Sequence, residues 1–258
     1  MQDRVLPLDG VLNFRDFGGY DTPNGRVVRG ALFRSASFHN ATEADIDALD
    51  RLGVRVLMDL RLPMERNHEP NKWPGERCRV HVCDADTTEG LPPHLVALLQ
   101  KDVTAQSIHD YMCGAYQGFP FHGGYVALFR AWFDELAGEG GPAVVHCAAG
   151  KDRTGTLCAL TLHALGVPDE AIVADYELTN HVLDLDARLP RIKARMEERL
   201  GQSIPADALR PMLGVHADYL RAGFAAMTEA HGSLDRYLED ALGVDASKRE
   251  KLRARFIA

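Results

Sequence analysis

The segment VVHCAAGKDRTGTLCAL, residues 144–160, passes from an apolar stretch through a polar, glycine-bearing loop into a second apolar stretch. Val144 and Val145 are predicted to end a buried strand, and Thr154 to enter a helix. A tight loop between two such elements directs several backbone N–H groups and the positive end of the helix at one point. The segment therefore predicts an anion-binding site, and Cys147 lies where that site begins.

Arg153 follows Cys147 by six positions, so the loop can wrap a guanidinium and a ring of amides around an oxyanion above the sulfur. Keeping a cysteine as a thiolate at neutral pH takes on the order of 5 kcal/mol of favourable interactions. A helix end supplies at most about 2 kcal/mol, so loop amides, the Thr154 hydroxyl and Arg153 must supply the rest. Such a thiolate can attack phosphorus and form a phosphocysteine without any metal.

Other interpretations of the loop fit less well. A nucleotide-binding P-loop needs Ser or Thr directly after Gly-Lys and an earlier glycine, but Asp152 follows Lys151 and Val145 holds the earlier position. A buried structural cysteine would leave the neighbouring charged residues unexplained. Two further classes remain as rivals, a catalytically weak phosphate-binding module and a sulfurtransferase, and turnover of p-nitrophenyl phosphate against thiosulfate would separate them.

The chain as a whole is typical of one globular domain spanning residues 1–258, with 46% hydrophobic and 26% charged residues. The net charge of −8 argues against nucleic acid as a bulk partner. No stretch approaches the roughly 20 apolar residues of a membrane span, and the N-terminus lacks a signal-peptide pattern, so we expect a cytoplasmic protein, with leaderless secretion left open. The five cysteines include no CxxC pair, which disfavours a disulfide framework or a zinc ribbon.

Strand-like and helical patterns alternate outward from the loop. A helix is predicted at 42–53, where both ends carry clear signals: Thr42 as N-cap and Gly53 as the stop. Strands are predicted at 26–35, 54–60, 79–84 and 142–147, and helices at 107–137, 154–166, 168–180, 183–213 and on both sides of Gly243. This order predicts an α/β fold with a central, mostly parallel sheet flanked by helices.

The sequence HCAAGKDRTG resembles the Cys-x5-Arg-Thr signature loop of the cysteine-dependent protein tyrosine phosphatases. Its Gly-Lys-Asp-Arg-Thr-Gly form is similar to the bacterial branch that contains mycobacterial protein tyrosine phosphatase B. Further similarities to this branch cover nearly the full length, at NFRDFGGY (13–20), LFRSASF (32–38), LMDLR (57–61), VADYELTN (173–180) and a C-terminal stretch. The resemblance implies hydrolysis of phosphomonoesters, with phosphotyrosine, phosphoserine or phosphothreonine proteins and phosphoinositides among the substrates of some members, and no cofactor.

The resemblance also assigns roles to the loop residues. Cys147 becomes the nucleophile, Arg153 the phosphate clamp and Thr154 the group that assists sulfur as it leaves, while His146 either orders the loop or tunes the cysteine. Lys151 is expected at the pocket rim, where it either contacts substrate oxygens or only pairs with Asp152. The phosphate cradle is predicted to consist of the amides from Ala148 to Arg153, including Ala149 and Gly150. The resemblance also implies that the arginine-rich helices at 183–213 fold over the pocket as a lid.

The general acid that protonates the leaving group has two main candidates. Asp84 follows the predicted strand at 79–84, where many tyrosine phosphatases carry their acid on a separate loop, and Asp86 lies beside it. Asp152, within the signature loop, is the alternative that we favour slightly. Both Asp84 and Asp86 could equally be solvated turn residues.

Four charged residues outside the loop are expected to brace the pocket through ion pairs, because arginine readily forms paired contacts with carboxylates. Cys83, next to Asp84, is a weaker candidate for a redox partner of Cys147. The four bracing residues are Arg15, Asp16, Arg34 and Arg61.

Overall fold

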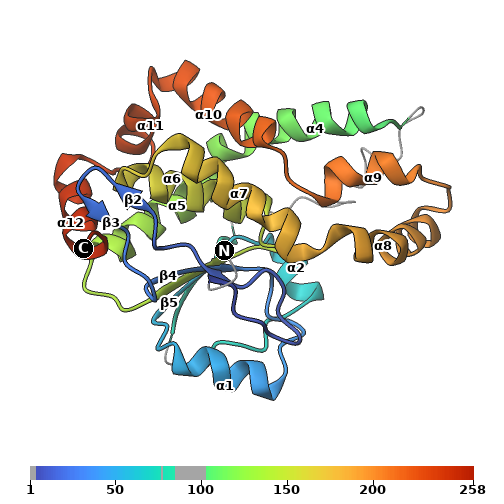
Figure 1. The fold of residues 1–258 in the computed structure, drawn as a ribbon, viewed down its shortest axis with the longest axis horizontal. Coiled ribbons are helices and arrows are strands. Elements are labelled where there is room, and N and C mark those ends of the chain that lie inside the picture. The colour runs from blue at the N-terminus through green and yellow to red at the C-terminus, as the bar shows by residue number, and fades with distance from the viewer. Residues whose placement is uncertain (1–3, 77, 85–102) are drawn as a thin grey trace.

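A five-stranded sheet forms the centre of the fold (Figure 1). The computed structural model describes residues 4–76, 78–84 and 103–258. Across the sheet the order is β1 (Arg15–Asp16), β4 (Leu32–Ser35), β7 (Ala143–His146), β5 (Val56–Asp59) and β6 (Arg79–His81). Strand β1 pairs antiparallel with β4, and all other neighbours are parallel. The predicted α/β fold with a mostly parallel sheet is therefore confirmed.

The predicted strand at 26–35 is two separate strands. Strand β3 (Gly25–Arg26) pairs with β2 (Asp21–Thr22) in a small ribbon, whereas β4 belongs to the central sheet. Between them Gly30 has a φ of 75°, in the left-handed region, and its N–H donates to the Asp16 carboxylate. A turn that needs this conformation interrupts the run of β-branched and apolar residues.

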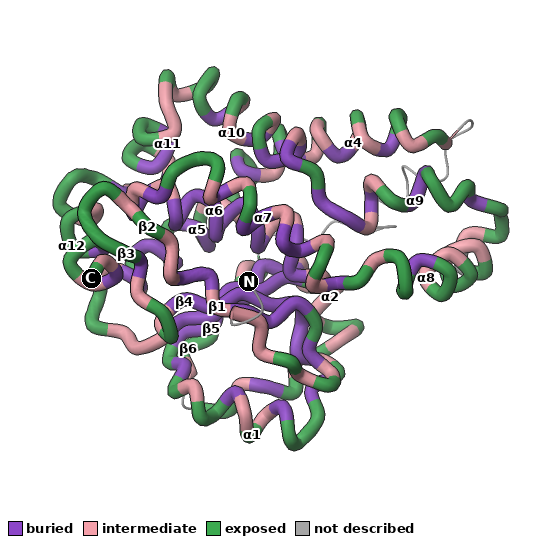
Figure 2. Tube along the Cα trace, viewed as in Figure 1, coloured by how far each residue is buried: buried purple, intermediate pink, exposed green. Residues whose placement is uncertain are grey.

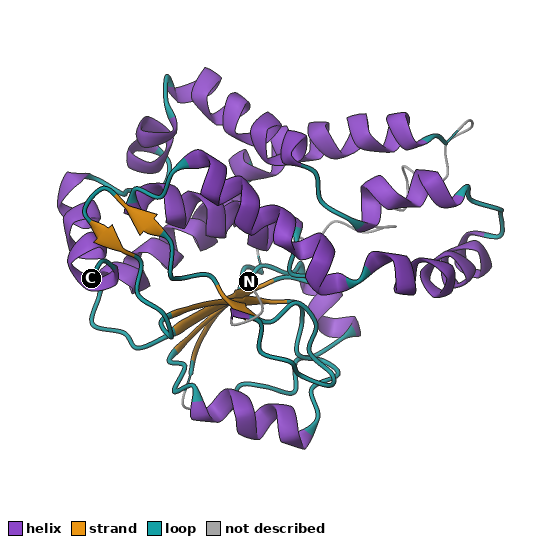
Figure 3. Cartoon of the chain, in the orientation of Figure 1, coloured by secondary structure: helices purple, strands orange, loops and turns teal. Residues whose placement is uncertain are grey.

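Helices cover both faces of the sheet, as Figures 1 and 3 show. Helix α1 (Glu43–Arg51) lies on one face, and α5 (Gly123–Ala137), α6 (Asp152–Leu165) and α12 (Ala246–Phe256) lie on the other. Neighbouring residues of the strands enter different cores, because successive side chains of a strand point to opposite faces. In β5, Met58 packs with the larger helical side, and Leu57 packs with Leu49 of α1.

A second group of helices extends beyond the sheet. Helix α4 packs against α9 and α10, and α8 is largely exposed along its length (Figure 2). The bounds of these and the remaining helices are α2 (Pro63–His68), α4 (Ala105–Gly118), α7 (Asp169–Leu183), α8 (Leu185–Leu200), α9 (Ala206–Leu213), α10 (Ala217–His231) and α11 (Leu234–Asp240), with a 3₁₀ turn at Phe119–Phe121. Within the described part of the chain, every helix is too short or too polar to cross a lipid bilayer.

Local signals placed several helix ends correctly. Thr42 accepts a hydrogen bond from the Asp45 N–H, and the Asp45 side chain accepts one from the Thr42 N–H, which completes a capping box at the start of α1. Gly166 ends α6 with a φ of 87°, and Gly243 separates α11 from α12 with a φ of 67°. The region predicted as one arginine-rich segment, 183–213, consists of the end of α7 followed by α8 and α9.

Candidate active site

The signature loop joins the central strand of the sheet to α6. Strand β7 ends at His146, Cys147 follows directly, and α6 begins at Asp152, so Arg153 and Thr154 lie in its first turn. Cys147 is 2% exposed. The predicted strand, loop and helix are confirmed, and the positive end of α6 faces the same loop as the cysteine.

Backbone carbonyls of the loop are held from outside. In a planar trans peptide the N–H of one residue points opposite to the C=O of the residue before it. The outward bonds thus turn the amides of Ala149, Gly150 and Lys151 inward, as a phosphate cradle requires. These bonds are Ser37 N to Ala148 O at 3.1 Å, Asn13 Nδ2 to Ala149 O at 3.3 Å and to Gly150 O at 2.8 Å, and Arg34 Nη2 to Gly150 O at 3.0 Å.

Gly150 is required at its position by both conformation and space. Its φ of 66° lies in the left-handed region. A Cβ atom added there would meet the Ser35 carbonyl oxygen at 2.2 Å. The loop therefore packs its backbone directly against the end of β4, which leaves no room for any side chain at residue 150.

Arg153 is fixed by a carboxylate that the sequence did not reveal. Its Nη1 lies 2.6 Å from Glu65 Oε2, and its Nη2 lies 2.8 Å from Glu65 Oε1. The Leu60 carbonyl oxygen accepts a further bond at 3.0 Å. Burial opposes the ionisation of Glu65, yet the bonds and charge of Arg153 hold the pKa of Glu65 below its usual value. The guanidinium is thus oriented before any phosphate arrives.

Lys151 does not lie at an open rim. It is 8% exposed, and its Nζ donates to the carbonyls of Met212, in the last turn of α9, and Gly214, the residue that caps this helix. Its Nζ also lies 3.3 Å from Asp152 Oδ2. In this conformation Lys151 therefore pairs with Asp152, which was the second of the two roles expected for it. The lysine therefore connects the signature loop to the segment at 183–213 and the turn after it.

The Asp152 carboxylate has a second support from α4. Tyr116 donates to Asp152 Oδ1 at 2.8 Å, and the Tyr116 and Tyr176 hydroxyl oxygens are 2.6 Å apart. Burial, and then the charge of Asp152, raise the pKa of Tyr116 well above its usual value. Tyr116 therefore stays a proton donor to the carboxylate and positions it.

Of the other acid candidates, only Asp84 lies within the described residues. Asp84 is 78% exposed and forms an ion pair with Arg66 of α2, and Asp86 falls outside the described residues. Cys83 is partly buried beside Gly124 of α5. Its role as a redox partner of Cys147 remains a prediction.

His146 connects the loop to a buried ion pair. Its Nε2 lies 3.5 Å from Asp59 Oδ2, and Asp59 is bonded at 2.7 Å to the Arg61 guanidinium. Burial lowers the pKa of His146 to about 4, despite the nearby Asp59 charge. The ring is therefore neutral at physiological pH and acts as a hydrogen-bonding brace.

The expected arginine braces are present around Asp175 of α7. Arg34 Nη1 lies 3.0 Å from Asp175 Oδ2, and Arg15 donates to the Asp175 carbonyl oxygen at 3.1 Å and to Thr179 at 3.0 Å. Asp16 differs from the expectation, because among the described residues its carboxylate accepts backbone N–H bonds from Gly18 and Gly30 and forms no ion pair with an arginine.

Thr154 is buried, and its Oγ1 makes no hydrogen bond within the described part of the chain. An unpartnered buried hydroxyl is costly to keep. Its position one residue after the clamp suits a group that is used during the reaction. The other buried cysteine near the loop, Cys158, has its pKa raised to about 12, first by burial.

Four functional residues were missed by the sequence analysis because their partners are remote in the chain. Helix α2 itself was not predicted, although Pro63 at its first position is a helix-start signal, and no local signal points to a contact 88 residues away. Asn13 lies in a motif quoted only for its resemblance, and Asp175 in another. The missed residues are Asn13, Glu65, Tyr116 and Asp175.

Comparison with known proteins agrees with this geometry. The model of a family described as the tyrosine phosphatase family matches residues 6–258. A Cupriavidus necator protein whose name places it among the tyrosine-protein phosphatases is 35% identical, over 98% of this chain and 88% of its own length. The triple specificity protein phosphatase PtpB of Mycobacterium tuberculosis is 33% identical over 96% and 98%, and a tyrosine-protein phosphatase of Nostoc commune is 32% identical over 87% and 74%.

Proposed function

Because this chain belongs to the tyrosine phosphatase family, we propose that it hydrolyses phosphotyrosine in proteins through a phosphocysteine formed on Cys147. One observation carries the proposal. Arg153 lies in the first turn of α6, and Glu65 of α2 holds its guanidinium. The adjacent loop has its carbonyls bonded from outside, so its amides turn inward beside the guanidinium. Hydrogen-bond donors that are already in position stabilise the negative charge of a phosphoryl group during its transfer.

In the first step the Cys147 thiolate attacks phosphorus, and the S–P bond forms as the bond to the leaving oxygen breaks. Arg153 binds two of the phosphoryl oxygens, and the amides of the loop bind the negative charge that they share. The leaving oxygen takes a proton from Asp152. Tyr116, which donates to Asp152 Oδ1, holds that carboxyl in place.

In the second step a water molecule attacks phosphorus, and the S–P bond breaks as Cys147 leaves as a thiolate. Asp152, now ionised, accepts a proton from the water. The Thr154 hydroxyl, free of other partners in the described residues, donates to the sulfur as its negative charge returns. The cycle uses side chains and backbone amides of this chain together with water.

The substrate range is proposed to extend beyond phosphotyrosine, to phosphoserine and phosphothreonine. The name of the Mycobacterium tuberculosis relative, a triple specificity protein phosphatase, supports this extension. Phosphoinositides are the alternative substrates, and for them the Lys151 ammonium would have to leave the carbonyls of Met212 and Gly214.

The helices α8 and α9 are proposed to act as a lid whose opening frees that lysine. A cytoplasmic location remains a prediction.

The deciding experiment traps the covalent intermediate. The full chain, mixed with a phosphotyrosine peptide and quenched in acid, should carry one phosphate on the peptide that contains Cys147, as seen by mass spectrometry. Cys147→Ser should lose turnover and still bind vanadate, whereas Cys158→Ser is the matched control that keeps the phosphocysteine. Turnover that persists in Cys147→Ser would refute the mechanism. A parallel panel of phosphoserine peptides and phosphoinositides decides the substrate range.

A further inference from the structure

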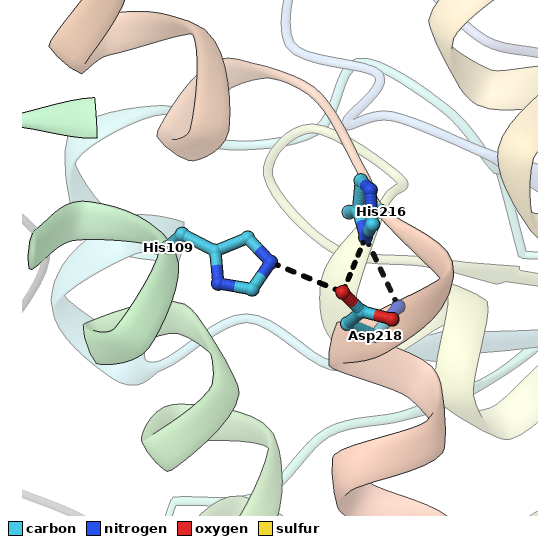
Figure 4. Close-up of side chains that lie close together, drawn as sticks. All are labelled: His109, His216 and Asp218. Atoms are coloured by element: carbon cyan, nitrogen blue, oxygen red, sulfur yellow. Dashed lines mark hydrogen bonds and ion pairs between the residues drawn. The ribbon is translucent and has the colours of Figure 1, made fainter. Parts of the chain in front are cut away.

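Three potential metal ligands meet where α4 packs against the start of α10 (Figure 4). His109 Nε2 lies 3.4 Å from Asp218 Oδ2, and His216 Nδ1 lies 3.2 Å from the same oxygen. One ligand atom of each residue lies within 4.8 Å of the other two. We propose that His109, His216 and Asp218 bind a divalent transition metal of the zinc class.

The distances from Asp218 to the two histidines fit a tetrahedral ion, and the two histidine nitrogens lie within 4.8 Å of each other. Zinc binds imidazole nitrogen and carboxylate oxygen at about 2.0–2.2 Å, so ligand atoms around a tetrahedral zinc lie roughly 3.3 Å apart. The two contacts to Asp218 Oδ2, at 3.2 and 3.4 Å, already have this length. Two imidazoles and one carboxylate are also a ligand set that favours zinc over calcium or magnesium.

The surroundings of His109 support a ligand role. Its Nδ1 faces Asp110 Oδ1 at 3.6 Å and Cys113 Sγ at 3.9 Å, one turn further along α4. Metal-bound histidines usually direct their second nitrogen to a carboxylate, which fixes the tautomer and the ring. The ring also packs at 5.1 Å, centroid to centroid, from the ring of Tyr219. The Nε2 atom is thereby directed toward Asp218.

His216 would exchange one bond for another when it binds metal. In this structure its Nδ1 accepts the Asp218 N–H at 3.2 Å and so caps the start of α10. Loss of one such hydrogen bond costs about 1 kcal/mol, which is small against the free energy of a three-ligand zinc site. The carboxylate of Asp218 also lies 3.7 Å from Arg221 Nη1.

The site opens onto a cavity of about 710 Å³ that His109 and His216 help to line. Three protein ligands and an open fourth position, filled by water, are a common zinc arrangement. The cavity wall also carries three aspartates, whose negative charge attracts cations. They are Asp184, Asp186 and Asp207, and Asp186 already pairs with Arg210 at 2.7 Å.

The position of the site places the metal between two segments that contact the signature loop. His109 lies seven residues before Tyr116 on α4, and Tyr116 donates to Asp152. Two residues before His216, the Gly214 carbonyl accepts from Lys151. A metal held by His109 and His216 would therefore connect the two segments that support the Lys151–Asp152 part of the signature loop.

The test uses the full chain after treatment with a chelator, titrated with Co²⁺ or Zn²⁺ alone. We expect one equivalent of Co²⁺ to give the intense visible bands of a tetrahedral complex, without the near-ultraviolet band of a cobalt–thiolate bond. His109→Ala, His216→Ala and Asp218→Asn should each weaken binding at least tenfold, about 1.4 kcal/mol. Zn²⁺ should raise the midpoint of thermal unfolding in the unsubstituted protein.

Two controls make the result decisive. His231→Ala is the matched control, because His231 ends α10, the helix that carries Asp218, and pairs at 3.4 Å with Asp240 of α11, outside the three-residue cluster. All titrations are repeated in Cys147→Ser, which removes binding at the reactive sulfur, and circular dichroism verifies that each variant is folded. Absence of a tetrahedral spectrum, or equal affinity in all folded variants, would show a plain ion-pair cluster and overturn the proposal.

Discussion

Glu65 and Arg153 form a two-point ion pair, with both guanidinium Nη atoms within 2.8 Å of a carboxylate oxygen, although the residues are separated by 88 positions in the chain. Glu65 lies in α2 and also accepts the Leu62 N–H at 2.7 Å, so the cap of one helix holds the clamp of another. Paired bonds of this type fix direction as well as position. The orientation of the clamp therefore depends on the fold around α2.

Glu65→Gln keeps the size of the side chain and removes its charge. We expect kcat/KM for p-nitrophenyl phosphate to fall about tenfold, equal to about 1.4 kcal/mol, because Arg153 loses its fixed direction. Glu69→Gln, at the other end of α2, is the control and should retain activity. Equal kinetics in the two variants, measured at saturating and limiting substrate, would remove the positioning role of Glu65.

The two acid candidates can be separated by leaving group. Asp152→Asn should lower kcat for phenyl phosphate or a phosphotyrosine peptide by about 10²–10⁴-fold, and lower it much less for activated aryl phosphates, which leave without a proton. Asp84→Asn removes only an exposed pair with Arg66 and should change kcat little. A leaving-group dependence that appears in Asp84→Asn and not in Asp152→Asn would reverse the assignment.

Lys151→Met keeps the apolar stem of the lysine and removes its bonds to the carbonyls of Met212 and Gly214. We expect faster amide hydrogen exchange in α9, because the segment opens more often when its contact with the loop is lost. Lys193→Met is the control, since Lys193 pairs with Glu197 inside α8. If α9 exchanges at the same rate in Lys151→Met as in the unsubstituted protein, the lysine does not hold the lid.

The buried His146 gives stability a defined pH dependence. Its pKa is about 4 in the folded chain and 6.5 in the unfolded chain, so the unfolded state binds more protons between these values. The stabilisation is complete above pH 6.5 and is lost as the pH falls toward 4, by about 3 kcal/mol in the free energy of unfolding. Denaturant titrations should show this slope in the unsubstituted protein and in His68→Asn, an exposed histidine control. A His146→Asn variant with an unchanged slope would contradict the prediction.

Local features of the fold followed from the sequence, and remote pairings did not. The Thr42 capping box, the left-handed Gly166 and the loop after β7 each depend on neighbours within a few residues, so their patterns were sufficient. The same holds for Cys147 and Arg153 as parts of one loop. The break between β3 and β4 was missed because apolar content outweighed one glycine.

Lys151 was expected at the pocket rim but is buried, and the reason lies in the packing of helices that are remote in the sequence. Its burial depends on α9, whose end reaches the loop only through the packing of α4, α9 and α10. A single sequence carries little information about such contacts between helices, because amphipathic faces match many partners. The same reasoning applies to Glu65, whose neighbours in the sequence carry no information about Arg153.

The lysine bond to α9 recognises the course of the main chain and not the identity of any side chain. Nζ contacts carbonyl oxygens at 212 and 214, and every amino acid supplies a carbonyl at such a position. Side chains along the outer surface of α8 and α9 are thus free to diverge without loosening their attachment to the loop. Chimaeras that take α8 and α9 from a relative should consequently keep a working catalytic loop.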